Sequence, residues 1–501
     1  MLFNSFQFLW LFPIIFLVMW GYRFAVARIG APETRNQKLA TKIENLLLIA
    51  ISYGLYMQWE WRYALVLLGV TAITYASALL LETKKLETKK PILFFTGALL
   101  ALLPLLVFKY TNFVLSACGS SIEVKLIAPL GISFYTFQAV GYLFDVYYGR
   151  TRAERNWWDY MLFVCFFPQL LSSPISKADE LLPQIKNRGL GVSRDARLGV
   201  RESKLASQMT QGCKWLLWGM FMKVVFADRL GIQVDSIYTN YEHLSGLSCF
   251  LGAVLYSMQI YGDFAGYSFM AVGVGELLGF ELINNFQRPY LAQSVTEFWR
   301  RWHISLTRWL TQNVYIPLGG SRCSKWRQYL NIMVTFLVSG LWHGANWTFI
   351  VWGGLHGILQ CVEKAIGLDP KGRFGNLENQ KSRKLGMAIK PLRILVTFLL
   401  VSTAWIFFRM PTIGDAFAFI GRILTDHTLT LAQSTPSTTI FILMSLSIVV
   451  LKDLMDEYCR PEHTILHNRH ALIRWFGYIA LAYLILLCGV FDAGSFIYVN
   501  F

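Results

Sequence analysis

Apolar runs long enough to cross a lipid bilayer recur along the whole of this 501-residue chain. Charged residues make up only 15% of the sequence, against roughly 25% in a typical soluble domain. A chain with so many apolar runs and so few charges is suited to lipid as its solvent. The sequence therefore predicts an all-α polytopic membrane protein.

The distribution of charge restricts the partners of the chain. No polar stretch is long enough to form a soluble domain, so we expect a single membrane domain over residues 1–501. The net charge of +16 comes from basic loops between apolar runs, as cytoplasmic loops require, and no basic unit of nucleic-acid-binding type is present. The eight cysteines form no CxxC pair, which argues against a disulfide framework or zinc module.

The basic loops also predict the topology. Placing each of them in the cytoplasm gives about twelve crossings, within a range of roughly 11–13, with both termini outside. The predicted spanning segments are Phe8–Ala27, a hairpin over Ile43–Leu81, Pro91–Ser116, Ile127–Tyr147, Cys213–Val234, Leu247–Ile283, a hairpin over Leu330–Val362, Ile394–Phe408, Thr439–Leu451 and Leu472–Val490.

Three segments depart from simple spans. Tyr160–Leu171 is short and has basic flanks on both sides, which favours a re-entrant or interfacial segment buried by protein. Leu247–Ile283 is too long for one span and contains Gly262-Asp263-Phe264, so we expect a broken or steeply tilted helix. Ser294–Leu310 is amphipathic and is expected to be one interfacial helix.

Ionisable residues at membrane depth are functional candidates because their burial is costly. Lys223, Asp263, His343 and His356 occupy such positions. Lys223 and Asp263 could instead form structural ion pairs. His343 lies at the tip of the second hairpin among glycines, where a partly desolvated imidazole is neutral and can accept a proton, although a hydrogen-bonded interfacial histidine would fit as well.

Two other patterns leave structural alternatives open. Basic and aromatic residues over Glu297–Leu306 could attract an anionic ligand or simply anchor an interfacial helix. His463, His467 and His470 have helical spacing for a metal, but a solvated loop explains them better, so no metal is expected. Neither a GxSxG elbow nor a P-loop is present.

Several runs resemble the membrane-bound O-acyltransferase family. They are Glu297–Leu306, Tyr315–Gly320 and Gly340–Ala345, with further similarity at Pro129–Gln138 and Phe166–Leu170. The resemblance is strongest to the bacterial alginate O-acetyltransferases and covers nearly the whole chain. It implies the fold of that family, in which re-entrant and interfacial helices accompany the transmembrane helices, with the catalytic motifs at about residues 294–360.

This resemblance implies acyl transfer across the membrane to an exported cell-surface polysaccharide, as in alginate biosynthesis. It identifies His343 as the base that takes the proton of the acceptor hydroxyl. It gives His303 the task of orienting the donor or stabilising charge at the carbonyl oxygen.

The donor implied is acetyl-CoA or a related acyl donor that enters from the cytoplasm, and no permanently bound cofactor is expected. Arg300, Arg301, Arg308 and Trp299 are then expected to bind this donor, since arginines attract phosphates. Members of the family act with an extracytoplasmic acetyltransferase partner, which we also expect here. The expected location is the bacterial inner membrane.

The chain departs from the family pattern in places, and alternative functions remain open, among them a non-catalytic scaffold for an export complex. Phe269 stands where a second carboxylate is common in the family, so any role of that group is absent or falls to Asp263. D-alanyl transfer to teichoic acid and O-acetylation of peptidoglycan are alternative reactions within the family. A polysaccharide or lipid transporter is an alternative from another class, but it would show paired broken helices, and only one break is expected here.

Overall fold

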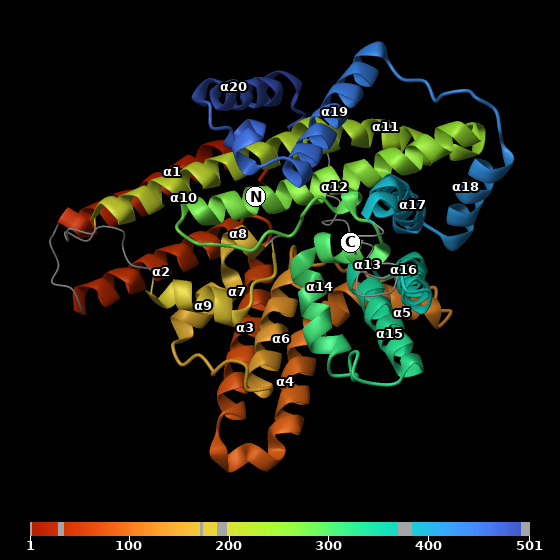
Figure 1. Ribbon diagram of the computed structural model, residues 1–501. Helices are drawn as coiled ribbons and strands as arrows, with labels where there is room; N and C mark the ends of the chain where they lie inside the picture. Colours follow the sequence, from red (N-terminus) through yellow and green to blue (C-terminus); the bar gives the residue numbers. More distant parts are fainter. Residues whose placement is uncertain (1–2, 29–34, 171–173, 188–197, 369–382, 492–501) are drawn as a thin grey trace. The chain divides into compact units, whose positions relative to one another are not determined.

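The computed structural model describes residues 3–28, 35–170, 174–187, 198–368 and 383–491 (Figure 1). Every regular element in these ranges is a helix. Six of the helical stretches described are long and apolar enough to cross a membrane: Phe6–Val26, Trp61–Leu81, Leu86–Ala117, Ile389–Arg409, Pro436–Tyr458 and Ala471–Cys488. These observations confirm an all-α polytopic membrane protein. The total of roughly 11–13 crossings, the sidedness of the loops and the single domain stay predictions.

The chain forms two compact units, of which the first comprises Met1–Trp218 and Tyr267–Ile283. Its helices are α1 (Phe6–Arg28), α2 (Arg35–Met57), α3 (Trp61–Leu81), α4 (Lys90–Leu105), α5 (Thr111–Ala117), α6 (Ile132–Tyr147), α7 (Trp157–Cys165), α8 (Phe167–Leu170) and α9 (Ala178–Asn187), with most of α10 (Leu198–Met220) and the last part of α12 (Gly246–Leu277). Helices α3, α4 and α6 pack side by side (Figure 1). The predicted hairpin of α2 and α3 is present.

The short segment expected to be re-entrant is indeed too short to span a bilayer. Helix α7 has nine residues and is therefore only about 14 Å long. Its residues from Asp159 to Cys165 and those of α8 are all buried by protein. Phe269, in the same unit, stacks on Trp215 with ring centroids 5.0 Å apart, so packing occupies the position where the family pattern has a carboxylate.

The second unit comprises Gly219–Gly266 and Asn284–Phe501. Its helices are α11 (Asp228–Thr239), the first part of α12, α13 (Val295–Arg301), α14 (Ile304–Leu310), α15 (Lys325–His343), α16 (Trp347–Ala365), α17 (Arg383–Arg409), α18 (Ile413–Thr425), α19 (Pro436–Tyr458) and α20 (Ala471–Cys488). Helices α15 and α16 form the predicted second hairpin. The catalytic motif region therefore lies in this unit.

Of the two alternatives expected for Leu247–Ile283, the break is absent, because α12 continues through Gly262 and Asp263, and the steep tilt stays a prediction. A Cβ atom at Gly262 would lie 2.5 Å from the Phe226 ring, so this glycine allows a close contact within the second unit instead of a bend. Lys223 donates hydrogen bonds to the carboxylates of both Asp263 and Asp228. The structural reading of Lys223 and Asp263 as an ion pair is therefore confirmed.

The histidines near the C-terminus do not share a helical face. Their segment folds as two single 3₁₀ turns, Pro461–His463 and Ile465–His467, and His470 follows outside both. Among the residues described, no three His, Cys, Asp or Glu side chains gather in an arrangement that could hold a metal ion.

Candidate active site

Two buried imidazoles face each other in the second unit. His343 is the last residue of α15, and His303 immediately precedes α14. Their ring centroids are 6.3 Å apart, and the exposed fractions of the two residues are 2% and 0%. The structure therefore brings together the two histidines that the sequence motifs predicted as catalytic, although they come from different helices.

Close packing of α15 against α16 places His343. A Cβ atom at Gly340 would lie 2.3 Å from the carbonyl oxygen of Phe349, and one at Gly353 would lie 2.3 Å from that of Phe336. Only glycine allows the two backbones to approach so closely. The next helix starts with a regular cap, since Asn346 accepts a hydrogen bond from the Thr348 amide at 3.2 Å. The tip of the hairpin is thus held at both helix ends.

A turn between α13 and α14 positions His303. The single amphipathic helix expected over Ser294–Leu310 is wrong, because α13 ends at Arg301 and α14 begins at Ile304. His303 has a φ of 45°, in the left-handed region that a non-glycine residue rarely adopts. The turn separates Trp299 from Leu306, so these two residues do not lie on one continuous helical face. It also turns the His303 imidazole toward His343.

Aromatic rings enclose both imidazoles. His343 contacts Trp352 and Phe408, with ring centroids 4.9 and 5.4 Å away, while His303 contacts Phe264 at 4.7 Å and Trp342 at 5.7 Å. Such surroundings penalise a charged ring. Burial lowers the pKa of His303 to about 3, so its imidazole is neutral at physiological pH. A neutral imidazole carries one N–H donor and one nitrogen acceptor, as proton transfer requires.

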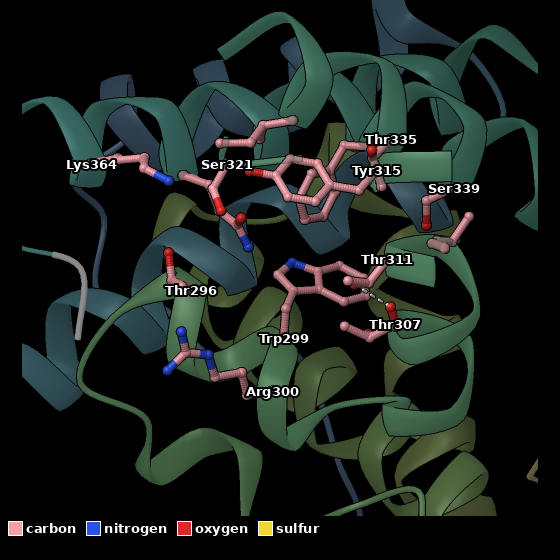
Figure 2. A pocket seen from close by; sticks show the side chains of 14 residues that line it. Thr296, Trp299, Arg300, Thr307, Thr311, Tyr315, Ser321, Thr335, Ser339 and Lys364 are labelled. Atoms are coloured by element: carbon pink, nitrogen blue, oxygen red, sulfur yellow. Dashed lines mark hydrogen bonds between the residues drawn. The ribbon is translucent and has the colours of Figure 1, made fainter. Parts of the chain in front are cut away.

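A cavity of about 430 Å³ is lined mainly by residues of α13, α14, α15 and α16 (Figure 2). Thr307 and Ser339 in its wall lie one helical turn from His303 and His343, respectively. Figure 2 shows the side chains of Arg300 and Lys364 on one side of the Trp299 indole and those of Ser339 and Thr307 on the other. The cavity therefore has a basic side and a side close to the two imidazoles.

Trp299 forms part of the cavity wall, and His356 fixes its orientation. The indole Nε1–H donates a hydrogen bond to His356 Nδ1 at 3.2 Å, and both residues are buried. Accepting at Nδ1 requires a neutral His356 that carries its proton on Nε2. His356 is thus a supporting residue, and Trp299, for which the sequence predicts donor binding, lines the cavity.

The three arginines expected at the donor site occupy different environments. Arg300 is exposed and lines the cavity. Arg301 instead forms ion pairs with Glu297 at 2.6 Å and with Glu457 at 3.0 Å. Burial alone would lower the pKa of Arg301, but its hydrogen bonds and ion pairs with Glu457 and Glu297 together raise it. Neither Arg301 nor Arg308 is among the residues that line the cavity. Of these three arginines, only Arg300 therefore lines the cavity.

Sequence reasoning missed several residues of this site. Lys364, in the last turn of α16, belongs to none of the patterns that indicated a site, yet it lies with Arg300 on the basic side of the cavity. Thr307 and Ser339 could have been found from the sequence, since each is four residues from a motif histidine. Asn285 lies 18 residues before His303, and nothing in the local pattern indicated that it contacts that turn.

The chain is similar to known proteins over most of its length. Residues 155–369 match the family described as MBOAT, membrane-bound O-acyltransferase family. The chain is 34% identical over 478 residues to a probable alginate O-acetylase AlgI of Azotobacter vinelandii, covering 92% of this chain and 86% of that protein. It is 35% identical to a probable alginate O-acetylase AlgI of Pseudomonas aeruginosa, covering 78% and 72%. It is also 34% identical to a peptidoglycan O-acetyltransferase of Helicobacter pylori, covering 74% and 72%.

Proposed function

Because this chain belongs to the membrane-bound O-acyltransferase family, we propose that it O-acetylates an exported cell-surface polysaccharide from a cytoplasmic acyl donor. The observation that carries the proposal is the pair of buried imidazoles whose ring centroids lie 6.3 Å apart beside a cavity with a basic side. The chain is a multi-pass membrane acyltransferase, and membership of this family sets aside the transporter alternative.

His343 is the proposed base. Its imidazole nitrogen takes the proton of the acceptor hydroxyl as the hydroxyl oxygen attacks the acyl carbonyl. A C–O bond forms and the carbonyl oxygen takes up the negative charge. When the intermediate collapses, the C–S bond of a thioester donor breaks, and the proton held by His343 passes to the leaving sulfur. The acyl group thus ends on the acceptor oxygen and the proton on the leaving sulfur, and the step requires neither an oxidant nor a metal.

His303 is the proposed partner of the carbonyl oxygen. Its neutral ring has one N–H that can donate a hydrogen bond to the developing oxyanion. The aromatic enclosure strengthens such a bond by keeping water away from the oxyanion, because electrostatic interactions grow as the local dielectric falls. A charged imidazolium would donate as well, but the low pKa of His303 makes that form rare.

Acetyl-CoA or a related acyl donor fits the cavity chemically. Arg300 and Lys364 can bind the phosphates of such a donor, and the Trp299 indole, which lies between them and the side chains of Thr307 and Ser339, offers an apolar wall for its thiol arm. The donor would then place its thioester near Thr307 and Ser339. We include Arg300, Lys364 and Trp299 in the proposed donor site and leave Arg301 in its ion pairs.

The proposed acceptor is based on the activities for which the relatives are named. Two of them are probable alginate O-acetylases, which supports a polysaccharide hydroxyl as acceptor. The similarity to a peptidoglycan O-acetyltransferase favours peptidoglycan as the second candidate. D-alanyl transfer to teichoic acid stays a third candidate within the family. We also propose that the protein acts in the bacterial inner membrane together with an extracytoplasmic acetyltransferase partner.

The test is His343→Ala in cells that lack the native gene. Ester-linked acetate on exported polysaccharide would be released by alkali and quantified, with the amount of protein in the membrane measured alongside. Loss of a general base predicts a fall of roughly 10²–10⁴-fold. His427→Ala is the matched control, since His427 is an exposed histidine of the second unit away from the cavity.

Unchanged acetylation by a normally inserted His343→Ala protein would refute the catalytic assignment. The same cells also decide between acceptors. Acetate lost from peptidoglycan, with the polysaccharide unaffected, would replace the first candidate by the second. Loss of D-alanine from teichoic acid would favour the third.

A further inference from the structure

The turn at His303 lacks the support that a helix start normally has. His303 is the N-cap residue of α14, but its side chain makes no capping hydrogen bond to that helix. An N-cap is usually Ser, Thr, Asn or Asp, whose oxygen accepts from one of the first free amides. The left-handed backbone at His303 is also unfavourable for a residue with a Cβ atom. Some other group must therefore stabilise this conformation.

Asn285 supplies the missing acceptors from outside the helix. The Ile304 amide donates to the Asn285 backbone oxygen at 3.1 Å, and the Ser305 amide donates to Asn285 Oδ1 at 3.0 Å. These are the first two amides after His303. Asn285 is fully buried, with an exposed fraction of 0%, so water does not compete for either hydrogen bond.

Asn285 itself is held in place by its neighbours. The Gln287 amide donates to the Arg301 backbone oxygen at 2.9 Å, which fastens the loop to the end of α13. The Phe286 ring packs edge-on against Trp302, with centroids 5.0 Å apart. The segment around Asn285 therefore contacts both sides of the turn between α13 and α14: Gln287 is hydrogen-bonded to Arg301, and Asn285 to Ile304 and Ser305.

We propose that Asn285 is a positioning residue that holds His303 in its left-handed conformation and so aims the imidazole at the reacting carbonyl. The inference rests on the proposed function, in which His303 donates to the oxyanion. Without the side-chain acceptor, the Ser305 amide is left unpaired in a buried position. The backbone then relaxes toward an ordinary φ, and the His303 ring moves away from His343.

The experiment measures acetyl transfer in inverted membrane vesicles supplied with radiolabelled acetyl-CoA. Asn285→Ala should lower kcat by about 100-fold, the loss expected when a catalytic group moves by about 1 Å, and leave the KM for acetyl-CoA within about twofold. Asn285→Asp keeps a side-chain acceptor of the same shape and should recover kcat to within about threefold of the wild type. A change of stability alone would lower the amount of protein but would not separate kcat from KM.

A matched control removes an ordinary cap. Thr412 accepts from the Asp415 amide at 3.1 Å at the start of α18, a helix of the same unit that does not line the cavity. Thr412→Ala should leave kcat unchanged. Should Asn285→Ala fail to insert, Asn285→Ser serves instead, because its hydroxyl sits one bond closer to the backbone and cannot reach the Ser305 amide.

Three results would overturn the inference. The first is a kcat for Asn285→Ala within about twofold of the wild type. The second is an Asn285→Asp variant as impaired as Asn285→Ala, which would assign the role to the amide N–H₂ group instead of the acceptor. The third is an equal loss in a His303→Gln background, because a residue that acts through His303 has nothing left to position there. Absence of transfer by the wild type would instead contradict the proposed function.

Discussion

The contact between α15 and α16 at Gly353 is the most direct test of how the site is built. A Cβ atom there would lie 2.3 Å from the Phe336 carbonyl oxygen and 3.3 Å from the Cα of Gly340. Real Cβ atoms keep at least 3.0 Å from such atoms, so Gly353→Ala must push the two backbones apart by about 0.7 Å. Both contacting groups are backbone, which cannot turn aside as a side chain would.

Gly354→Ala provides the comparison, because the neighbouring position has room. A Cβ atom at Gly354 would meet only the tip of the Leu337 side chain, at 3.8 Å. Both substitutions gain the same helix propensity, about 0.5–1 kcal/mol. The difference between the two variants therefore isolates the clash, and overpacking of this kind costs about 1–3 kcal/mol.

The displacement also reaches the reacting groups. Gly340 lies three residues before His343, and Trp352, next to Gly353, contacts the His343 ring. A misplacement of about 1 Å costs on the order of 100-fold in rate, so Gly353→Ala should lower acetyl transfer by about 10- to 100-fold.

Thermal unfolding in detergent and acetyl transfer in vesicles would be measured for both variants. Gly354→Ala should match or exceed the wild type in melting temperature and keep its activity. If Gly353→Ala behaves like Gly354→Ala in both assays, the close approach of α15 and α16 is wrong, and so is its role in placing His343.

Two further predictions concern charge and pH. Arg300→Gln should raise the KM for acetyl-CoA by about tenfold, because one charge-assisted hydrogen bond to the donor is lost. Arg301→Gln should mainly lower the melting temperature, because it breaks the ion pairs with Glu297 and Glu457. Equal effects of the two substitutions on KM would contradict these different roles. The folded-state pKa of His303, about 3, lies below the unfolded value near 6.5, so the unfolded state binds more protons between these values and stability falls as pH drops below about 6.5. The loss amounts to about 2 kcal/mol by pH 5, and His303→Gln should remove it. Melting temperatures at pH 7 and pH 5 check this, and an equal decrease in the variant and the wild type would count against a neutral, buried His303.

Much of the fold follows from the sequence because its signals are local. Apolar length and basic flanks are sufficient to predict the spans matching α1, α3, α4, α17, α19 and α20, and the glycines around residue 340 predict the second hairpin. The break expected in α12 failed because Gly262 has two uses that look alike in a sequence. It can bend a helix or admit a neighbour, and only the position of Phe226 shows which use applies.

The residues of the proposed donor site were predictable only in part, for a similar reason. The three arginines of the motif are equivalent in the sequence pattern because all are basic and lie within nine residues. Their fates differ because Glu457, more than 150 residues away, neutralises Arg301 and leaves Arg300 facing the cavity. A single sequence contains no signal for such a distant carboxylate. Lys364 was not predicted because it lies 64 residues after Arg300 in the sequence, although both line the cavity.

The two histidines reach the site by opposite means, and this affects how each can be perturbed. His343 ends a regular helix, and its position depends on glycine contacts that a propensity argument can find. His303 sits in a strained turn that contradicts the helical pattern of its own segment, and a loop residue outside that segment stabilises it. Helix periodicity could not predict this turn, because a strained backbone conformation persists only where surrounding contacts impose it. Substitutions at Gly353 should therefore shift His343 together with its helix, whereas substitutions at Asn285 should release His303 alone and leave the hairpin intact.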